Sequence, residues 1–394
     1  MRVAIIGGGA IGSAVALFLK RLGGAAVEVT VIEPDPTLRL ASSARSAASL
    51  RQQFSNAVNV HMSQFGLDMI THADEWLAID GQTADLGFVE SGYLFLATTP
   101  SGAATLRANH QVQSAAQACV DLLDGPALAR RCPWLNGDDV LLASLGTAGE
   151  GWFDGEALAR ALQRKARALG TQWRVARVVG LVGSDPSDGA LRAAQLDNGQ
   201  TLQADVFVNA AGPWAGAVGR LAGLTVPVHA RRRTVFAFDC PVTLPRTPLV
   251  VDPSGCWFRS EGGGFIGGWS PGAGDNDPDD LPLDQPDLAQ FENRLWPALA
   301  LRVPAFSALR RRSAWDGYYE VHPLDHNALI GPHPQCANLI IAAGFSGHGL
   351  QHAAAAGRGV AEWILHQRYL SLDLSAFGLQ RVTDRRAFVE QAII

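Results

Sequence analysis

Three glycines near the N-terminus have the spacing of a dinucleotide-binding turn. Gly7, Gly9 and Gly12 form a GxGxxG pattern directly after the short apolar run at residues 3–6. The first glycine permits a tight turn, the second lets a pyrophosphate approach the backbone, and the third lets the next helix pack on the strand. We expect that helix over residues 11–22, with its N-terminal N–H groups facing the phosphates.

An acidic residue follows at the distance expected of a ribose-binding carboxylate. Glu33 ends the second predicted strand and lies 21 residues after Gly12, where about 20 are expected. A carboxylate at this position favours a free ribose 2′-hydroxyl, and therefore FAD or NAD over NADP. The alternative is an exposed carboxylate at a strand end, but strand, turn, helix and acid all occur in the expected order.

Size and composition narrow the class of protein. The 394 residues are 47% hydrophobic and 18% charged, which predicts a substantial buried core divided over two domains. The formal net charge of −5 provides no broad basic surface for nucleic acid.

The cysteines and the apolar runs exclude further classes. Five cysteines are scattered without a CxxC pair, and the histidines lack metal-ligand spacing, so we expect neither a metal site nor a disulfide framework. We find no signal peptide before the first strand and no apolar run long enough to span a bilayer. The sequence therefore predicts a cytoplasmic protein without a transmembrane segment.

The remaining elements place these motifs in a larger architecture. Helices are expected at about 43–51, within 56–79, at about 102–132, from Asp154 to Gly170, and at about 287–301. Parallel strand–turn–helix units lie at the start, middle and end of the chain, and antiparallel strands lie between them. This predicts an α/β (α+β) fold, with a Rossmann-like domain built from discontinuous segments and an inserted, mainly antiparallel substrate domain. The first domain is placed at residues 1–85, 145–225 and 320–394, and the second at 86–144 and 226–319.

Several segments together resemble the D-amino acid oxidase superfamily of FAD-dependent oxidoreductases, over essentially the whole chain. They are IIGGGAIGSAVA, SSARSAASLRQQFS, GWFDGEALARAL, VNAAGPWA and IIAAGFSGHGLQHA. The last is the most diagnostic, because FAD is long and an NAD dehydrogenase has no need of a second glycine turn near its C-terminus. RQQFS, RRRTVFAF and DGYYEVHPLDHNALIGPHP look closest to FAD-dependent oxidoreductase-domain proteins related to mitochondrial complex I assembly. The superfamily includes glycine/sarcosine oxidase-like enzymes, and sarcosine and dimethylglycine dehydrogenases are similar but more distant.

The resemblance implies an FAD site whose residues come from all parts of the chain. Position by position, the cofactor-binding residues would be Gly7, Gly9, Ala10, Ile11, Gly12, Glu33, Pro34, Ser42, Ser43, Arg45, Ser46, Val178, Ala210, Gly212, Trp214, Gly344, Phe345, Ser346, Gly347, His348, Gly349 and Leu350. The turn before the last helix would direct N–H groups at the flavin, where negative charge gathers on reduction.

The resemblance also implies a substrate site that binds a carboxylate. Arg51 occupies the place of the carboxylate-binding arginine in sarcosine oxidase-like proteins. Tyr318 and Tyr319 lie on a predicted strand, and one of the two would face the pocket. Arg259, on the inserted sheet, and His348, beside the flavin, complete the catalytic candidates.

Two departures from the related enzymes refine the expected chemistry. The strand reading WDGYYE has no cysteine and the first glycine turn has no histidine, so covalent attachment is not expected and FAD would be bound non-covalently. Sarcosine-type oxidases use a lysine near the flavin for the reaction with oxygen. This chain has only Lys20 and Lys165, both on nucleotide-domain helices, and Gln351 where those enzymes have another lysine. A dehydrogenase is therefore favoured over an oxidase.

The expected activity is oxidation of the CH–NH bond of a small amino acid or N-alkyl amino acid by hydride transfer to flavin N5. The expected partners are a carboxylate-bearing amine and an electron acceptor such as oxygen, a quinone or an electron-transfer protein. Two alternatives stay open: a flavin 2-hydroxy-acid dehydrogenase, and an assembly or scaffold protein that retains FAD for structure.

Overall fold

A six-stranded sheet carries the first glycine turn. The computed structural model describes residues 1–183, 189–272 and 274–392. Parallel pairing joins five strands, and only the edge strand β19 is antiparallel to its neighbour. The strand order is β19 (Leu329–His333), β20 (Cys336–Ala343), β13 (Val206–Asn209), β1 (Arg2–Ile6), β2 (Glu28–Ile32) and β9 (Gln172–Arg174).

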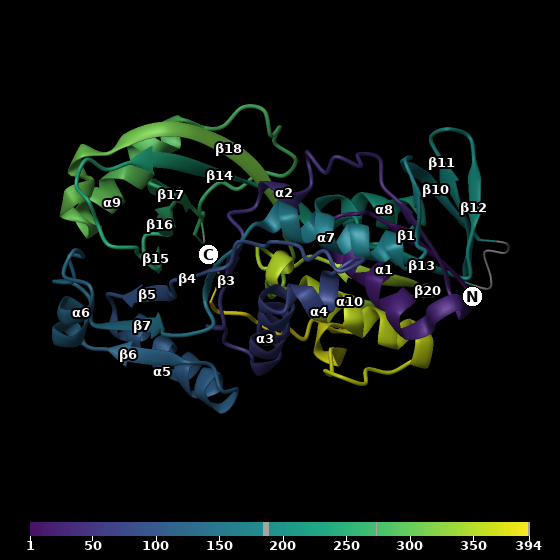
Figure 1. Cartoon of the computed structure of the whole chain (residues 1–394), viewed down its shortest axis with the longest axis horizontal. Helices are drawn as coiled ribbons and strands as arrows, with labels where there is room; N and C mark the ends of the chain where they lie inside the picture. Colours follow the sequence, from purple (N-terminus) through teal and green to yellow (C-terminus); the bar gives the residue numbers. More distant parts are fainter. Residues whose placement is uncertain (184–188, 273, 393–394) are drawn as a thin grey trace.

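Three long helices pack together over this sheet (Figure 1). Helix α1 (Ala10–Gly23) lies against both α7 (Gly155–Ala168) and α10 (Gly349–His366). Small residues permit the close approach of α1 and α10, since a Cβ on Gly357 would lie 2.6 Å from the backbone of Ala14. Asp154 caps α7 as expected, with its carboxylate accepting a 2.8 Å hydrogen bond from the N–H of Ala157.

An eight-stranded, mainly antiparallel sheet forms the other end of the molecule, at the left of Figure 1. Its one parallel pair joins β15 to β5. Phe236, Phe238, Phe258 and Phe306 are fully buried in the core beside this sheet. The strand order is β18 (Arg310–Val321), β14 (His229–Asp239), β17 (Gly264–Trp269), β16 (Cys256–Glu261), β15 (Leu249–Val251), β5 (Tyr93–Ala97), β7 (Leu142–Gly146) and β6 (Val120–Leu123).

Two three-stranded sheets complete the strands that the structure describes. One contains β10 (Val178–Gly183), β11 (Leu191–Leu196) and β12 (Thr201–Gln203). The other joins β3 (Ser49–Leu50), β8 (Gly151–Trp152) and β4 (Val89–Glu90). The other α-helices are α2 (Ser42–Arg45), α3 (Ala57–Thr71), α4 (Ala73–Leu77), α5 (Pro100–Ala115), α6 (Gly125–Arg131), α8 (Ala215–Leu221), α9 (Trp296–Arg302) and α11 (Gln380–Thr383).

Two expected helices are shorter than the sequence predicted. The helix expected at 43–51 ends at Arg45, because Ala48 has a left-handed φ of 50° and β3 then pairs with β8. The helix expected at 102–132 is split into α5 and α6 by β6, which pairs with β7. Both differences arise from pairing with strands distant in the sequence, which overrides local helical preference.

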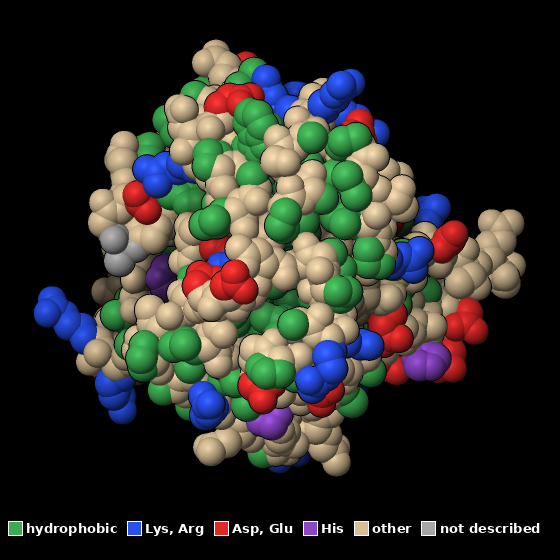
Figure 2. Space-filling model, turned by 90° about the vertical axis from the view of Figure 1, so that its left-hand side faces the viewer, with side chains coloured by type: hydrophobic (Ala, Val, Ile, Leu, Met, Phe, Trp, Pro, Cys, Tyr) green, Lys and Arg blue, Asp and Glu red, His purple; other side chains and the backbone are tan. Residues whose placement is uncertain are grey.

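The described residues were also compared with the requirements of a membrane-spanning helix and of a metal site. No helix in the described ranges is both long and apolar enough to cross a bilayer. The same ranges hold no cluster of three side chains suited to a metal ion, and no disulfide joins the cysteines there. Figure 2 shows acidic and basic side chains interspersed over the face at the left of Figure 1.

Candidate active site

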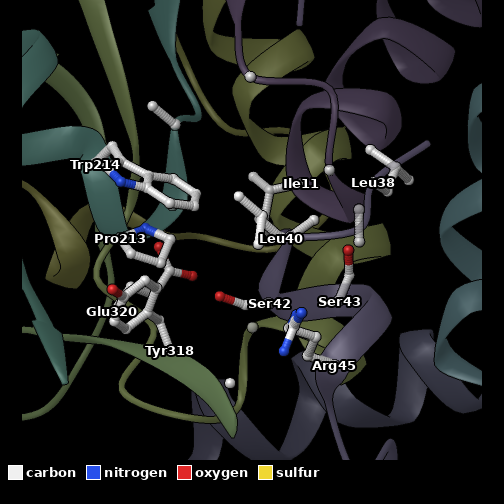
Figure 3. A pocket seen from close by; sticks show the side chains of 18 of the residues that line it. Ile11, Leu38, Leu40, Ser42, Ser43, Arg45, Pro213, Trp214, Tyr318 and Glu320 are labelled. Carbon is white, nitrogen blue, oxygen red and sulfur yellow. The ribbon is translucent and has the colours of Figure 1, made fainter. Parts of the chain in front are cut away.

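A cavity of about 800 Å³ opens beside the carboxyl ends of β1 and β2. Its walls come from the first glycine turn, the segment 37–47, the start of β10, the 3-10 helix η2 (Gly212–Trp214) and the end of β18. Figure 3 shows Ile11, Leu40 and Ser43 across the cavity from Trp214 and Pro213. The lining residues come from segments that lie far apart in the sequence, as a long dinucleotide requires.

The first glycine turn is shaped so that only glycine fits at two of its positions. Gly7 has a φ of +102°, and a Cβ there would lie 2.3 Å from the carbonyl oxygen of Ala210. A Cβ on Gly12 would lie 1.9 Å from the carbonyl oxygen of Gly7. Gly9 is different, because its Cβ position meets only Ser43 Oγ, at 3.7 Å, and the residue lines the cavity. The turn therefore presents bare backbone to the cavity at Gly9.

Glu33 lines the cavity at the end of β2 and is fixed by the backbone. Its Oε2 accepts a 2.7 Å hydrogen bond from the N–H of Gly8, and its Oε1 accepts one of 2.9 Å from Asp35. Burial raises the pKa of Glu33, whereas these two N–H donors favour the ionised form. The carboxylate is thus positioned to accept hydrogen bonds from a ribose.

The hydroxyls of α2 indicate that the cavity takes a polar ligand. Ser42 Oγ and Ser43 Oγ are buried and have no hydrogen-bond partner among the described residues. Both side chains are drawn at the cavity wall in Figure 3. Because buried hydroxyls are normally hydrogen-bonded, these two are suited to phosphate or ribityl oxygens. The cavity, the glycine turn and these hydroxyls together fit FAD.

Most of the predicted cofactor residues do line this cavity. They are Gly7, Gly9, Ala10, Ile11, Glu33, Pro34, Ser42, Ser43, Arg45, Ser46, Val178, Ala210, Gly212, Trp214, Gly347, Gly349 and Leu350. Ser346 and His348 instead line a smaller cavity next to it, and Gly12, Gly344 and Phe345 line neither of the two.

The smaller cavity measures about 60 Å³ and adjoins the larger one. Six residues line both: Ser46, Ala47, Trp257, Tyr319, Gly347 and Leu350. Its remaining walls include Arg51, Tyr93, His348 and Gln351. A ligand in the small cavity would therefore lie beside a ligand in the large one.

Arg51 brings a buried positive charge to the small cavity. Its guanidinium donates to the carbonyl oxygens of Gln53 at 2.8 Å and Ala392 at 2.5 Å, and it lies 4.1 Å from the ring centre of Phe54. No carboxylate of the described residues forms a salt bridge with it. Burial lowers the pKa of Arg51, yet an arginine keeps its proton in proteins. A buried guanidinium held only by neutral groups is suited to binding an anion.

His348 adds a neutral imidazole to the same cavity. Burial and the neighbouring His352 hold the pKa of His348 well below its usual value, and burial lowers that of His352 to about 3. The two rings lie 5.1 Å apart, and His352 Nε2 is bonded to Ser63 Oγ at 3.0 Å. His348 Nε2 is buried without a partner among the described residues. It is thus available to a ligand.

The other three catalytic candidates differ in which cavity they line. Tyr319 lines both cavities, and the backbone of Gly347 lies against its ring, so a Cβ there would come within 2.4 Å of it. Tyr318 lines the large cavity and donates to the carbonyl oxygen of Leu281 at 2.7 Å. Arg259 lines neither cavity; its guanidinium pairs with Glu261 and donates to the Ala47 carbonyl oxygen at 2.7 Å.

Sequence reasoning missed two buried carboxyl groups near these cavities. Glu320 lines the large cavity, and its Oε2 accepts a 3.0 Å hydrogen bond from the N–H of Gly344. Burial raises the pKa of Glu320 to about 7. Glu150 lies behind Arg51 and Tyr93 and is described below. The alternation of side chains along β18 was the only signal for Glu320, since Tyr318 and Glu320 point the same way.

A profile of the family described as "FAD dependent oxidoreductase" matches residues 2–363, nearly the whole chain. The chain belongs to this family. FAD is accordingly its cofactor, and the large cavity has the residues to hold it.

The chain is also similar to named proteins and to solved structures. It is 39% identical to the FAD-dependent oxidoreductase domain-containing protein 1 of Bos taurus, over 96% of this chain and 84% of that protein. It is 27% identical to the mitochondrial dimethylglycine dehydrogenase of Homo sapiens, over 92% of this chain but 42% of that longer protein. Among solved structures, the L-proline dehydrogenase from P. horikoshii superposes with a TM-score of 0.83 at 25% identity, covering 98% of each chain.

Proposed function

We propose that this oxidoreductase removes a hydride from the carbon of a CH–NH group in a small amino acid or N-alkyl amino acid. The observation that carries the proposal is the buried guanidinium of Arg51, without a carboxylate partner among the described residues, in a small cavity that adjoins the cofactor cavity. FAD, when bound, supplies the acceptor for the hydride. The names of similar proteins, L-proline dehydrogenase and dimethylglycine dehydrogenase, support an amine substrate.

The residues of the small cavity have complementary roles in this proposal. Arg51 binds the substrate carboxylate, because charge-assisted hydrogen bonds are the strongest way to hold it in a buried site. His348, held neutral by burial, accepts a hydrogen bond from the substrate amine or receives its proton as the C=N bond forms. Tyr93 stays a neutral phenol, because burial raises its pKa to about 12. A volume of about 60 Å³ limits the substrate to a small molecule.

The positions of the two lysines support a dehydrogenase over an oxidase. Lys20 Nζ donates to the carbonyl oxygens of Gly24 and Val27, and Lys165 Nζ donates to that of Ala78. Neither residue lines either cavity. A lysine that would assist reaction with oxygen at the site is therefore absent from its walls, and we infer an electron acceptor other than oxygen.

An anaerobic titration of the purified yellow protein tests the activity. Amino acids, N-methyl amino acids and 2-hydroxy acids are offered in turn while the flavin absorbance is followed. Bleaching by an amine supports the proposal, and admitting air then separates a dehydrogenase, which stays bleached, from an oxidase. Bleaching by hydroxy acids alone would replace it with the 2-hydroxy-acid dehydrogenase. Bound FAD that none of them reduces would favour a protein that keeps FAD for structure.

A further inference from the structure

A fully buried carboxyl group lies directly behind the small cavity. Glu150 immediately precedes β8 and has no solvent exposure. Gly146 makes room for it, since a Cβ at that position would lie 1.7 Å from Glu150 Oε2. The site is therefore built to contain this carboxyl group.

Glu150 is surrounded by hydrogen-bond donors. Its Oε1 accepts from the N–H of Gln52 at 2.6 Å and from that of Gln53 at 3.1 Å. Its Oε2 accepts from the N–H of Tyr93 at 3.1 Å and from Gln53 Nε2 at 3.0 Å. Four donors converge on two oxygens. A carboxylate accepts all four bonds. An amide in its place would direct its own NH₂ group at two of these donors and lose those bonds.

These bonds fix the backbone on both sides of the small cavity. Gln52 and Gln53 directly follow Arg51, and the N–H of Arg51 itself donates to Gln351 Oε1 at 2.8 Å. Hydrogen bonds therefore fix the backbone on both sides of the Arg51 Cα. The backbone of Tyr93, which also lines the small cavity, is held by the same carboxyl group. One side chain therefore joins two walls that lie 42 residues apart in the sequence.

Gln53 extends the network to a third segment. Its Oε1 accepts a 2.7 Å hydrogen bond from Ser144 Oγ on β7, and its Nε2 also donates to the carbonyl oxygen of Tyr93. The amide is therefore fixed in one orientation, with its NH₂ toward Glu150. Fully satisfied buried networks of this kind make one arrangement of the backbone much more stable than others.

We propose that Glu150 is the positioning residue of the substrate site, which holds Arg51 and Tyr93 in register and balances the buried charge of Arg51. This rests on the proposed function insofar as the ligand of Arg51 is a carboxylate. Glu150 does not line the cavity, so it acts through these two residues. Burial raises the pKa of Glu150 to about 7 and the charge of Arg51 acts against that rise, so the ionised carboxylate and the guanidinium stabilise each other and lower the cost of keeping Arg51 buried.

The test compares Glu150→Gln with Glu90→Gln in the FAD-loaded protein. Glu90 lies on β4, is exposed, and accepts a hydrogen bond from the N–H of Gly149 at 2.6 Å, so it is a matched control close by. The probe is methoxyacetate, an ether analogue of N-methylglycine that has the carboxylate and no oxidisable N–H. Its dissociation constant is read from the change in flavin absorbance, and FAD content and thermal midpoint are measured in parallel.

We expect Glu150→Gln to weaken methoxyacetate binding at least tenfold, while Glu90→Gln changes it less than twofold. With an oxidisable amine, KM should rise by a similar factor while kcat changes less than threefold, because the lost interaction is with the bound carboxylate. Unchanged binding and KM in Glu150→Gln would overturn the proposal. Glu150→Asp, which keeps the charge but is one methylene shorter, should bind with intermediate affinity, and it replaces Glu150→Gln if that variant does not fold.

Hydrogen–deuterium exchange separates this proposal from the proposed activity, because it needs no substrate. Glu150→Gln should speed exchange at residues 49–56 and 91–97 and leave the first glycine turn protected as in the wild type. Wild-type protection of both segments would overturn the positioning role even if an amine reduces the flavin. If Glu150→Gln loses this protection and no amine reduces the flavin of the wild type, the positioning role is upheld and the proposed activity is overturned.

Discussion

The N–H of Arg51 donates a hydrogen bond of 2.8 Å to Gln351 Oε1, a residue 300 positions later in the chain. Arg51 follows β3, and Gln351 lies in the first turn of α10, directly after the second glycine turn. The proposed carboxylate-binding residue is therefore fixed to the segment that the family resemblance assigns to the flavin. Both residues line the small cavity, so this bond ties two parts of its wall together.

Replacing Gln351 by leucine should destabilise the protein and weaken substrate binding together. Gln351 Oε1 accepts from the N–H of Arg51 and from Ser63 Oγ, so leucine leaves the buried N–H of Arg51 unpaired and removes one of the two partners of Ser63 Oγ. We expect a loss of about 1–3 kcal/mol in the free energy of unfolding, measured with urea, and a higher KM. The exposed Gln111→Leu on α5 is the control. A stability equal to wild type would mean that the buried N–H of Arg51 finds another acceptor.

Replacing Arg51 by alanine should leave FAD bound and abolish most reduction by substrate. The residue lines the small cavity and not the large one, so the cofactor loses no contact. Loss of a charge-assisted pair should lower kcat/KM by at least a hundredfold, or about 3 kcal/mol. Rapid-mixing reduction of the flavin measures it, with the exposed Arg130→Ala as control. Wild-type reduction kinetics in Arg51→Ala would remove this residue from the site.

Two alanine substitutions in the first glycine turn should have different effects. Gly12→Ala places a Cβ 1.9 Å from the carbonyl oxygen of Gly7, so both stability and FAD binding should be lost. Gly9→Ala meets only Ser43 Oγ, at 3.7 Å, so the protein should fold normally but bind FAD at least tenfold more weakly. Urea unfolding and quenching of flavin fluorescence measure the two properties. Gly125→Ala, which meets nothing within 4 Å, is the control.

Acid sensitivity should depend on Asp325, which is buried in the connection between β18 and β19. Burial pushes the pKa of Asp325 upward, but the hydrogen bonds from His322 and Arg381 outweigh it and hold that pKa well below its usual range. Its folded pKa is thus below the unfolded value of about 3.9, so its stabilising contribution is complete above that pH and is lost as the pH falls below it.

Asp325→Asn should therefore be less stable at pH 7 by about 3–5 kcal/mol, because Arg381 is left buried without its carboxylate. Its unfolding free energy should also fall less than that of the wild type between pH 5 and pH 3. Urea midpoints at several pH values measure both effects, with the exposed Asp74→Asn as control. Parallel acid curves for wild type and variant would show that Asp325 does not titrate with folding.

The cofactor site could be predicted from the sequence because its signals are local. Gly7, Gly9 and Gly12 lie within one turn, and Glu33 follows at a fixed distance along a single βα unit. The second glycine turn at Gly347 and Gly349 has a similar local signature. The pocket walls around Ser42 and Ser43 were identified only through the family resemblance, since a short serine-rich segment has no pattern of its own.

The support of the substrate site could not be predicted in this way. Glu150 accepts hydrogen bonds from residues 57 to 98 positions away, and its neighbours in the sequence give no indication of such partners. For the same reason β3 and β6 were missed, because each is defined by pairing with a strand elsewhere in the chain. Arg259 shows the converse: its place on the inserted sheet suggested a contact with substrate, but its guanidinium pairs with Glu261 and lines neither cavity.

The parallel pairing of β13 with both β1 and β20 has a consequence for biogenesis. Phe207 on β13 pairs with Ala4 on one side and Leu339 on the other, so the sheet beneath the cofactor cavity cannot close until the last of these strands has left the ribosome. Helix α10, which follows β20, packs on α1 from the very start of the chain. Such long-range contacts fold slowly. A complete FAD site, with the second glycine turn at the start of α10, is therefore present only once nearly the whole chain has been synthesised.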